Sequence, residues 1–163
     1  MDSIKCIKTR RSRRNLQPGV VDRKTIEGIV DCGRFAPTAN NIQPCEFVVI
    51  TDRQALLKLS EVAVNGSFAK NASFCIIVVA KHEKYYLEDG CAATENILLA
   101  VNDCGLSACW VAGDKKDYAD AVLKLLGVPP GYKLVSIIPV GFSKEQSGVT
   151  KRELKDILHW EKF

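Results

Sequence analysis

The stretch Phe74-Cys75-Ile76-Ile77-Val78-Val79-Ala80 is seven residues long and entirely apolar. Isoleucine and valine dominate it, and β-branched side chains favour strands. Successive side chains of a strand point to opposite faces of a sheet, so a strand that is apolar throughout must be covered on both faces. The stretch therefore predicts a central strand in a layered fold, and it is too short to span a membrane.

Other patterned segments flank this strand on both sides. Apolar spacing, with capping aspartates at Asp22 and Asp52, predicts several helices, and Pro37 ends one of them. Helices are expected over 2–9, 22–36, 52–64, 86–104, 115–126 and 151–158, a turn at 65–66, and further strands over 46–50, 106–112 and 133–141. We therefore expect a single domain over residues 1–163, of the α+β class, with four or five strands and helices around them.

Composition narrows the class of protein further. The chain has 163 residues and a formal charge of +4, much of it in one short cluster, which favours a small anionic ligand over a long polyanion. Seven cysteines without a C-x-x-C pair argue against zinc-ribbon and thioredoxin-like sites and indicate reduced thiols. Residues 1–15 lack the apolar core of a signal peptide, so a cytoplasmic protein is expected.

The predicted helix over 86–104 is apolar on most of its circumference. Such a helix is expected either at the centre of the fold or in a subunit interface.

The cluster Arg10-Arg11-Ser12-Arg13-Arg14 places four guanidinium groups within five positions. Arginine is always protonated, and its planar fork matches phosphate oxygens, while the serine hydroxyl can donate one more hydrogen bond. The cluster predicts a phosphate clamp, with a solvated basic face or a weak nucleic-acid patch as the alternative. Lys151 and Arg152 form a second basic pair that could reach the same phosphate or simply lie on a helix surface.

The loop over 36–44 is the second informative stretch. Asn41 and Gln43 offer donors and acceptors that suit a ring with an alternating N–H and C=O edge, such as an isoalloxazine. The alternative is that these amides bond their own backbone, which we favour for Asn40. The sequence has no metal-ligand spacing, P-loop or G-x-G-x-x-G turn, and neither of its two histidines lies in a nucleophile signature. Flavin chemistry needs little from a protein beyond binding, orientation and electrostatics.

Five motifs, in order, resemble those of the nitroreductase-like flavoproteins. Residues 10–14 resemble the family's R-R-S-x-R opening, and residues 36–44 resemble its A-P-S-x-x-N-x-Q-P loop. Residues 89–100 are similar to its D-x-G-x-A-x-x-N-x-L-x-A helix, residues 105–110 to its G-L-G-x-x-W strand, and residues 158–161 to its closing segment. The resemblance runs from about residue 4 to the C-terminus and implies a nitroreductase-like fold with a mostly antiparallel sheet.

The resemblance also implies a homodimer with two FMN sites at its interface. Arg10, Arg11, Ser12 and Arg14 would hold the phosphate and ribityl chain, together with Lys151 or Arg152. The partner subunit's side of the site would supply Thr38, Asn41 and Gln43. Asn65 would reach the isoalloxazine edge, and the backbone of Ala112 and Gly113 would lie near the reactive flavin nitrogen.

Three positions depart from the family pattern. Cys45 stands where the family usually has tryptophan, and we expect it to be a neutral packing residue. Ala112 replaces an acidic residue of the best-known nitroaromatic reducers, and Ala72-Ser73 replaces a common Ala-Pro. The chain also lacks the inserted helices of longer members, which is consistent with a more open flavin face.

The expected function is an FMN-dependent NAD(P)H oxidoreductase. NADH or NADPH would reduce the flavin and leave, and a nitro compound, quinone or similar small acceptor would then take the electrons. The alternatives are a non-catalytic polyanion-binding module, which would show steeply salt-dependent binding, and a flavin-binding dimer without turnover.

Overall fold

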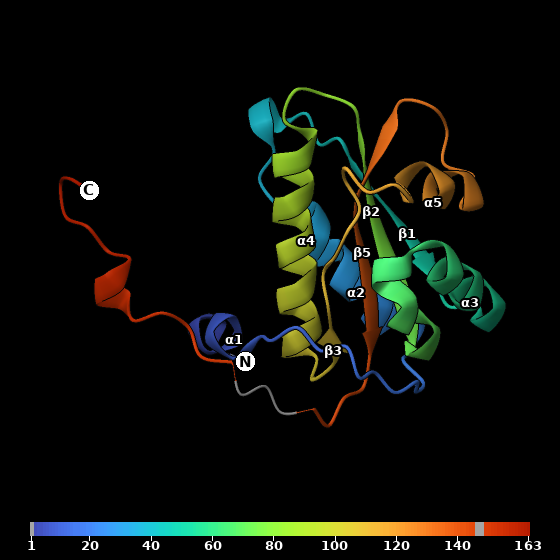
Figure 1. Cartoon of the computed structure of the whole chain (residues 1–163), viewed down its shortest axis with the longest axis horizontal. Helices are drawn as coiled ribbons and strands as arrows, with labels where there is room; N and C mark the ends of the chain where they lie inside the picture. Colours follow the sequence, from blue (N-terminus) through green and yellow to red (C-terminus); the bar gives the residue numbers. More distant parts are fainter. Residues whose placement is uncertain (1, 146–148) are drawn as a thin grey trace.

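The computed structural model describes residues 2–145 and 149–163, and in it a five-stranded sheet lies between two layers of helices (Figure 1). The path through the sheet is β1 (Cys45–Ile50), β2 (Phe74–Lys81), β5 (Tyr132–Gly141) and β3 (Ser107–Ala108), and β4 (Val111–Ala112) also pairs with β5. All of these pairs are antiparallel. The predicted α+β fold with a mostly antiparallel sheet is confirmed. Among the described residues, no helix has the length and apolar character needed to cross a membrane.

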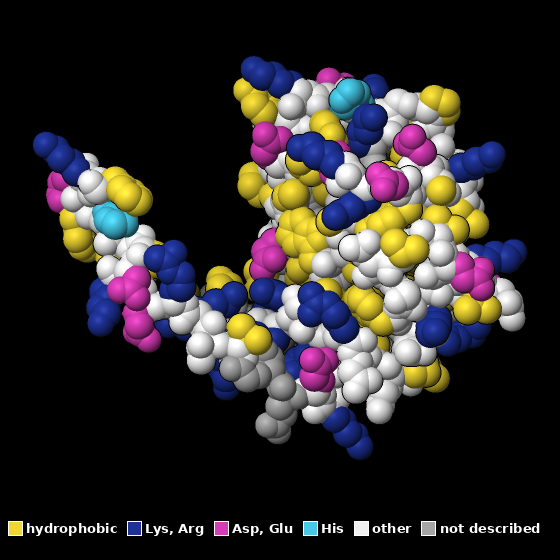
Figure 2. All heavy atoms as spheres, viewed as in Figure 1, with side chains coloured by type: hydrophobic (Ala, Val, Ile, Leu, Met, Phe, Trp, Pro, Cys, Tyr) yellow, Lys and Arg dark blue, Asp and Glu magenta, His cyan; other side chains and the backbone are white. Residues whose placement is uncertain are grey.

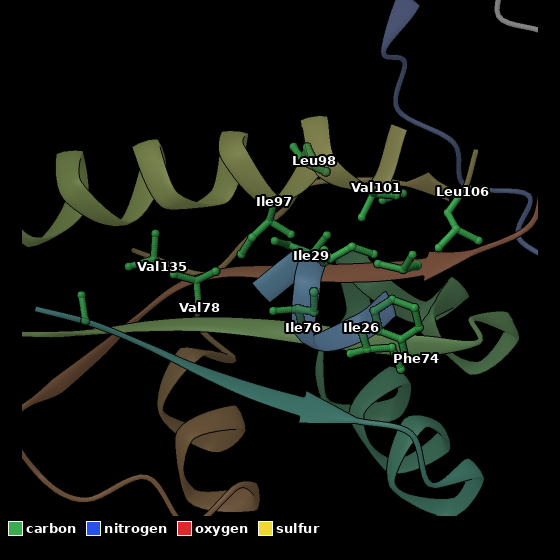
Figure 3. Close-up of a cluster of buried hydrophobic side chains, with 14 residues drawn as sticks. Ile26, Ile29, Phe74, Ile76, Val78, Ile97, Leu98, Val101, Leu106 and Val135 are labelled. Atoms are coloured by element: carbon green, nitrogen blue, oxygen red, sulfur yellow. The ribbon is translucent and has the colours of Figure 1, made fainter. Parts of the chain in front are cut away.

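Strand β2 is the middle of the molecule, as its sequence predicts. All seven residues from Phe74 to Ala80 are buried. Phe74, Ile76 and Val78 belong to the core cluster on one face (Figure 3), and the intervening residues of the strand belong to the cluster on the other face. Each fully buried Ile or Val contributes roughly 1.5–3 kcal/mol relative to exposure, so this strand holds both helical layers to the sheet.

Helices α2 (Arg23–Arg34) and α4 (Tyr86–Asp103) cover the first face. The predicted cap of α2 is present, because the Asp22 carboxylate accepts the Thr25 amide at 2.9 Å. Glycine allows the close approach of α4 to the sheet, since a Cβ on Gly90 would lie 2.6 Å from Val135 Cγ2. This contact fixes the first turns of α4 against the sheet.

The second face is covered by α3 (Arg53–Val62), the 3-10 segment η2 (Val64–Asn71) and α5 (Ala119–Leu125). Asp52 caps α3 as predicted, accepting the Ala55 amide at 2.8 Å. Gly127 follows α5 with φ +65°, the left-handed conformation that favours glycine after a helix. The sequence placed the start of this helix four residues early, and the turn predicted at 65–66 lies within η2.

Two further predictions about elements are wrong. The strand expected over 106–112 is two short strands, β3 and β4, with Cys109 and Trp110 between them. The helix expected over 151–158 is reduced to the 3-10 turn η3 (Leu154–Asp156). Residues 149–163, here called the C-terminal arm, stand away from the body (Figures 1 and 2). A short helix is marginal in water without a surface on which to bury its apolar side, and the large apolar side chains of the arm are exposed in the single chain.

Candidate functional site

The arginine cluster lies in an extended segment, residues 10–17, here called the strap. Helix α1 (Ser3–Thr9) ends at Arg10, and the strap then crosses the edge of the sheet. The Arg13 amide donates to the Ala108 carbonyl at 2.8 Å, and Gln17 exchanges two backbone hydrogen bonds with Phe142. Pairing with β3 thus holds the strap extended, and its arginines do not share a helical face.

The side chains of the strap differ in their partners. Arg10 Nε lies 3.3 Å from Glu95 Oε1, and Arg11 Nη1 folds back to donate to two backbone carbonyls at 2.8 Å. Burial raises the pKa of the Cys109 thiol, while the charges of Arg14 and Arg10 and a hydrogen bond with Ser12 lower it in part. Arg10, Ser12 and Arg14 are therefore gathered around Cys109.

Arg13 was not among the predicted site residues, but it has the least satisfied side chain of the strap. Its Nη1 is buried and has no hydrogen-bond partner in the described part of the chain. A buried charged donor without a partner is unfavourable by roughly 1–3 kcal/mol or more, so this nitrogen is suited to an incoming anion or a partner chain.

The strap already binds a carboxylate of its own chain. Glu145 Oε2 accepts the successive amides of Arg14 and Asn15, each at 3.3 Å. Consecutive backbone N–H groups that point at one oxygen are a common form of anion site. The backbone and side chains of the strap together therefore favour negatively charged ligands.

The loop over 36–44 contains the turn η1 (Ala39–Asn41) and is unusually strained. Asn40, Asn41 and Gln43 have φ values of 51°, 55° and 53°, in the left-handed region. Such residues cost on the order of 1 kcal/mol or more each unless their surroundings hold them. The Thr38 hydroxyl accepts the Gln43 amide at 3.1 Å, and the Gln43 side chain donates to Asn41 Oδ1 at 3.1 Å.

The strap and the loop lie toward opposite ends of α4. Asp89, in the first turn of α4, accepts the Ala39 amide of the loop at 3.0 Å. Near the other end, the Asn102 side chain donates to the Cys6 carbonyl of α1, just before the strap. Thirteen residues of helix separate Asp89 from Asn102, or roughly 20 Å at 1.5 Å per residue. A single chain therefore keeps its two predicted ligand-binding segments well apart.

Ala112, Gly113 and Asn65 lie beside β4, on the same edge of the sheet as the strap. A Cβ on Gly66 would lie 3.4 Å from Val111 Cγ1, which places the exposed Asn65 next to this strand. The Gly113 amide donates to the Val135 carbonyl at 3.0 Å, and Tyr118 Oη donates to the Ala112 carbonyl at 2.5 Å. These two backbone groups are rigidly held but already hydrogen-bonded.

Lys151 and Arg152 lie on the C-terminal arm and are exposed. The Arg152 guanidinium donates to the Asp156 carbonyl at 2.7 Å, within the arm itself. The structure does not bring this basic pair onto the strap of its own chain in the part that it describes.

A cavity of about 110 Å³ borders the loop, lined by Gly33, Arg34, Ala36, Thr38, Gln43, Cys45 and Ala93. Burial, together with the charges of Asp89 and Cys91, raises the pKa of the Cys45 thiol to about 11. Cys45 is thus a neutral thiol at pH 7, as expected of a packing residue. No cluster of three or more metal-ligating side chains occurs among the described residues.

Sequence reasoning missed the roles of Asp89, Glu145 and Arg13. Asp89 had a signal, because a carboxylate at the start of a largely apolar helix needs a partner when buried. The sequence gives no such signal for Glu145 or Arg13. The hydrogen bonds of Glu145 and the unpartnered nitrogen of Arg13 both depend on how the strap crosses the sheet.

Known proteins resemble this chain over nearly its full length. The model of the nitroreductase family matches residues 7–74 and 61–142. A protein of Archaeoglobus fulgidus, provisionally named NADH dehydrogenase/NAD(P)H nitroreductase, is 34% identical over 172 residues, covering 99% of each chain.

Two solved structures share the fold over nearly the full length. One, from Bacteroides thetaiotaomicron, is provisionally named NADH dehydrogenase/NAD(P)H nitroreductase. It superposes with a TM-score of 0.93 at 25% identity and covers 100% of this chain and 99% of that one. The other is an FMN-dependent nitroreductase from Clostridium difficile, with a TM-score of 0.89 at 27% identity and coverage of 98% and 99%.

The raised pKa of Cys45 predicts slow, strongly pH-dependent alkylation. Only the thiolate reacts, so with a pKa of about 11 the reactive fraction is near one in a thousand at pH 8 and grows about tenfold per pH unit up to pH 10. Iodoacetamide labelling, followed by peptide mass spectrometry, measures the rate at this position. A Cys45→Ser variant controls for assignment of the peptide, and rapid labelling at pH 7.5 would contradict the prediction.

Proposed function

Because this chain belongs to the nitroreductase family, we propose that it is an FMN-dependent oxidoreductase that transfers electrons from NADH or NADPH to a nitro compound, a quinone or a similar small acceptor. FMN is the cofactor named for a relative of the same fold. The observation that carries the proposal is the strap, which gathers four arginines within five positions and leaves the buried Nη1 of Arg13 without a partner in the described part of the chain, so that its charge suits the phosphate end of FMN.

The residues that would hold FMN come from several parts of the chain. The phosphate and ribityl chain would contact the strap, through Arg10, Arg11, Ser12 and Arg14. The ring would lie along the edge formed by Asn65, Ala112 and Gly113. Thr38, Asn41 and Gln43 would approach from a second copy of the chain, and Lys151 or Arg152 would complete the phosphate site.

The separation of strap and loop along α4 supports a homodimer. Two α4 helices packed antiparallel about a twofold axis would bring the loop of one copy beside the strap of the other. The outer surface is suited to such packing, because a groove of about 280 Å³ runs between α1, α2 and α4. Ile4 and Ile7 of α1 are 57% and 56% exposed beside it. These side chains gain a partner only in an assembly.

The C-terminal arm supports the same assembly. Its large apolar side chains are exposed in the single chain, including Leu154, Trp160 and Phe163. A groove of about 650 Å³ lies between α2 and the edge of β1, and its lining includes the apolar side chains of Ile26, Phe47 and Val49 beside charged residues of α2. An arm reaching across to this groove on a partner would bury both surfaces and so stabilise the dimer.

Bound FMN would supply the redox chemistry, taking a hydride from NAD(P)H and passing electrons to the acceptor. The strap arginines would neutralise the phosphate and fix the orientation of the ring. Tyr118 and Val135 would hold the backbone of Ala112 and Gly113 rigid at the ring edge. The methyl group of Ala112 has no proton to donate, so protons would come from solvent or substrate. NAD(P)H and acceptor would use the same open face in turn.

A non-catalytic dimer that binds flavin or another polyanion is the second candidate. The charge of the strap favours this dimer as well, and a measurement of turnover separates it from the enzyme.

The seven cysteines are free thiols in the structure, which is compatible with the reducing cytoplasm predicted from the sequence.

The direct test is colour and turnover. We expect the purified protein, supplied with FMN, to be yellow, to lose its flavin absorbance on anaerobic addition of NADH or NADPH, and to regain it when a quinone or nitroaromatic acceptor is added. A protein that binds FMN and is never bleached would support the non-catalytic dimer. A colourless protein that does not take up FMN would overturn both flavin proposals.

The phosphate site predicts a ligand-specific effect of Arg14→Ala. Loss of one charged hydrogen-bonding group should weaken FMN binding about tenfold or more, while riboflavin, which lacks the phosphate, should lose little. Fluorescence titration of both flavins measures the difference. Lys124→Ala is the control, because Lys124 is an exposed cation on α5, outside the strap and outside the groove between α2 and β1. Equal losses for FMN and riboflavin would contradict a phosphate contact.

A shared site predicts complementation between two defective chains. Arg14→Ala damages the strap, and Asn41→Gly removes a loop side chain without straining its left-handed backbone, since Asn41 has φ 55°. In a mixed dimer, one site would combine both intact segments. Co-refolding equal amounts should restore about a quarter of the wild-type sites, measured by tight FMN binding, because half of the dimers are mixed. A mixture no better than the average of the two variants would place the site within one chain.

A further inference from the structure

The carboxylate of Asp89 is buried and accepts a hydrogen bond from the loop over residues 36–44. The residue is 7% exposed, and its Oδ1 accepts the Ala39 amide at 3.0 Å. Nothing in the proposed chemistry uses this carboxylate. A buried ionised group is retained only where a partner compensates its loss of hydration, and here the partner is a backbone amide of the loop.

The position of Asp89 is rigid because its neighbour Gly90 lies directly against β5. A Cβ at Gly90 would approach Val135 Cγ2 to 2.6 Å, so the first turns of α4 cannot shift toward the sheet. One turn further along, Thr94 Oγ1 bonds the Gly90 carbonyl at 2.7 Å and Ser136 Oγ at 2.8 Å. The carboxylate is thus presented from a point fixed to the core.

The loop needs such an external support. Three of its residues have left-handed backbones, and the bonds of Thr38 and Gln43 tie the loop only to itself. Its far end is held at the Pro44 carbonyl, which accepts the Lys81 amide of β2 at 2.9 Å. At its near end, Ala36 donates to the Gly33 carbonyl of α2 at 3.2 Å, and the bond from Ala39 to Asp89 fastens the turn itself to α4.

We infer that Asp89 is a positioning residue: its carboxylate holds the turn over residues 39–43 in the strained conformation that presents Thr38, Asn41 and Gln43 to a ligand. The inference rests on the proposed function for the identity of that ligand, FMN. It does not rest on it for the conformation of the loop, which exists in the chain without ligand. Asp89 touches neither cofactor nor substrate and acts only through the loop.

Three variants separate positioning from general support of the helix. Asp89→Ala removes the acceptor, whereas Asp89→Asn keeps an Oδ1 acceptor and loses only the charge. Glu88→Ala is the matched control, because Glu88 is an exposed acidic residue in the same first turn of α4 and has no recorded bond to the loop. It removes the same favourable charge from the helix N-terminus.

Two measurements decide the inference, amide hydrogen exchange of the flavin-free protein and the FMN dissociation constant. For Asp89→Ala we expect exchange of residues 38–43 to accelerate about tenfold or more and FMN binding to weaken about tenfold. Asp89→Asn should stay within about threefold of wild type on both, and Glu88→Ala should change neither.

The inference is overturned if exchange in Asp89→Ala rises equally throughout the chain, if the loop is released and FMN affinity is unchanged, or if Asp89→Asn behaves like Asp89→Ala. Should Asp89→Ala fail to fold, Asp89→Leu, which is branched at Cγ like aspartate and has no acceptor, takes its place with the same expected losses. If the wild-type protein binds no FMN, the proposed function fails, while the exchange measurements still decide the role of Asp89.

Discussion

The burial of β2 on both faces is the constraint on which the rest of the structure depends. A strand with apolar side chains on both faces can be satisfied only by two helical layers, and the chain supplies α2 and α4 on one side and α3, η2 and α5 on the other. The length of α4 follows the length of the sheet that it covers. The core therefore keeps apart the loop and the strap, which lie toward the two ends of α4.

This separation shapes the candidate site. The strap is built at the edge of the sheet by backbone pairing with β3, and its arginines are directed by that pairing rather than by a helix. The loop is built at the start of α4, around left-handed residues and a buried carboxylate. A ligand that needs both segments needs two chains, which is why we propose a dimer as the unit of function.

Much of the fold could be predicted where local chemistry decides it. The β-branched run of β2 and the aspartate caps of α2 and α3 each act within a few residues, and each is found as predicted. The structure of the C-terminal arm could not be predicted in this way. Whether Leu154 and its neighbours form a helix depends on a surface that a single chain does not offer.

The candidate site was predictable in residue types more than in geometry. Four arginines in five positions indicate an anion site whatever the backbone does, but the pairing with β3 that directs them depends on residues far away in the sequence. The conformation of the loop was also out of reach, since nothing local distinguishes left-handed Asn41 and Gln43 from ordinary turn residues. The buried nitrogen of Arg13 and the bond from Asp89 to Ala39 arise only when distant segments meet.

Glu145 places a negative charge against the positively charged strap. Because this carboxylate already neutralises the amides of Arg14 and Asn15, an approaching dianion meets a like charge there. Its attraction must come from the guanidinium groups, whose planar donors match the oxygens of a phosphate. Binding of an anion at the strap therefore depends on side chains that reach past a carboxylate of the same chain, and the repulsion from Glu145 is a cost that any such ligand must overcome.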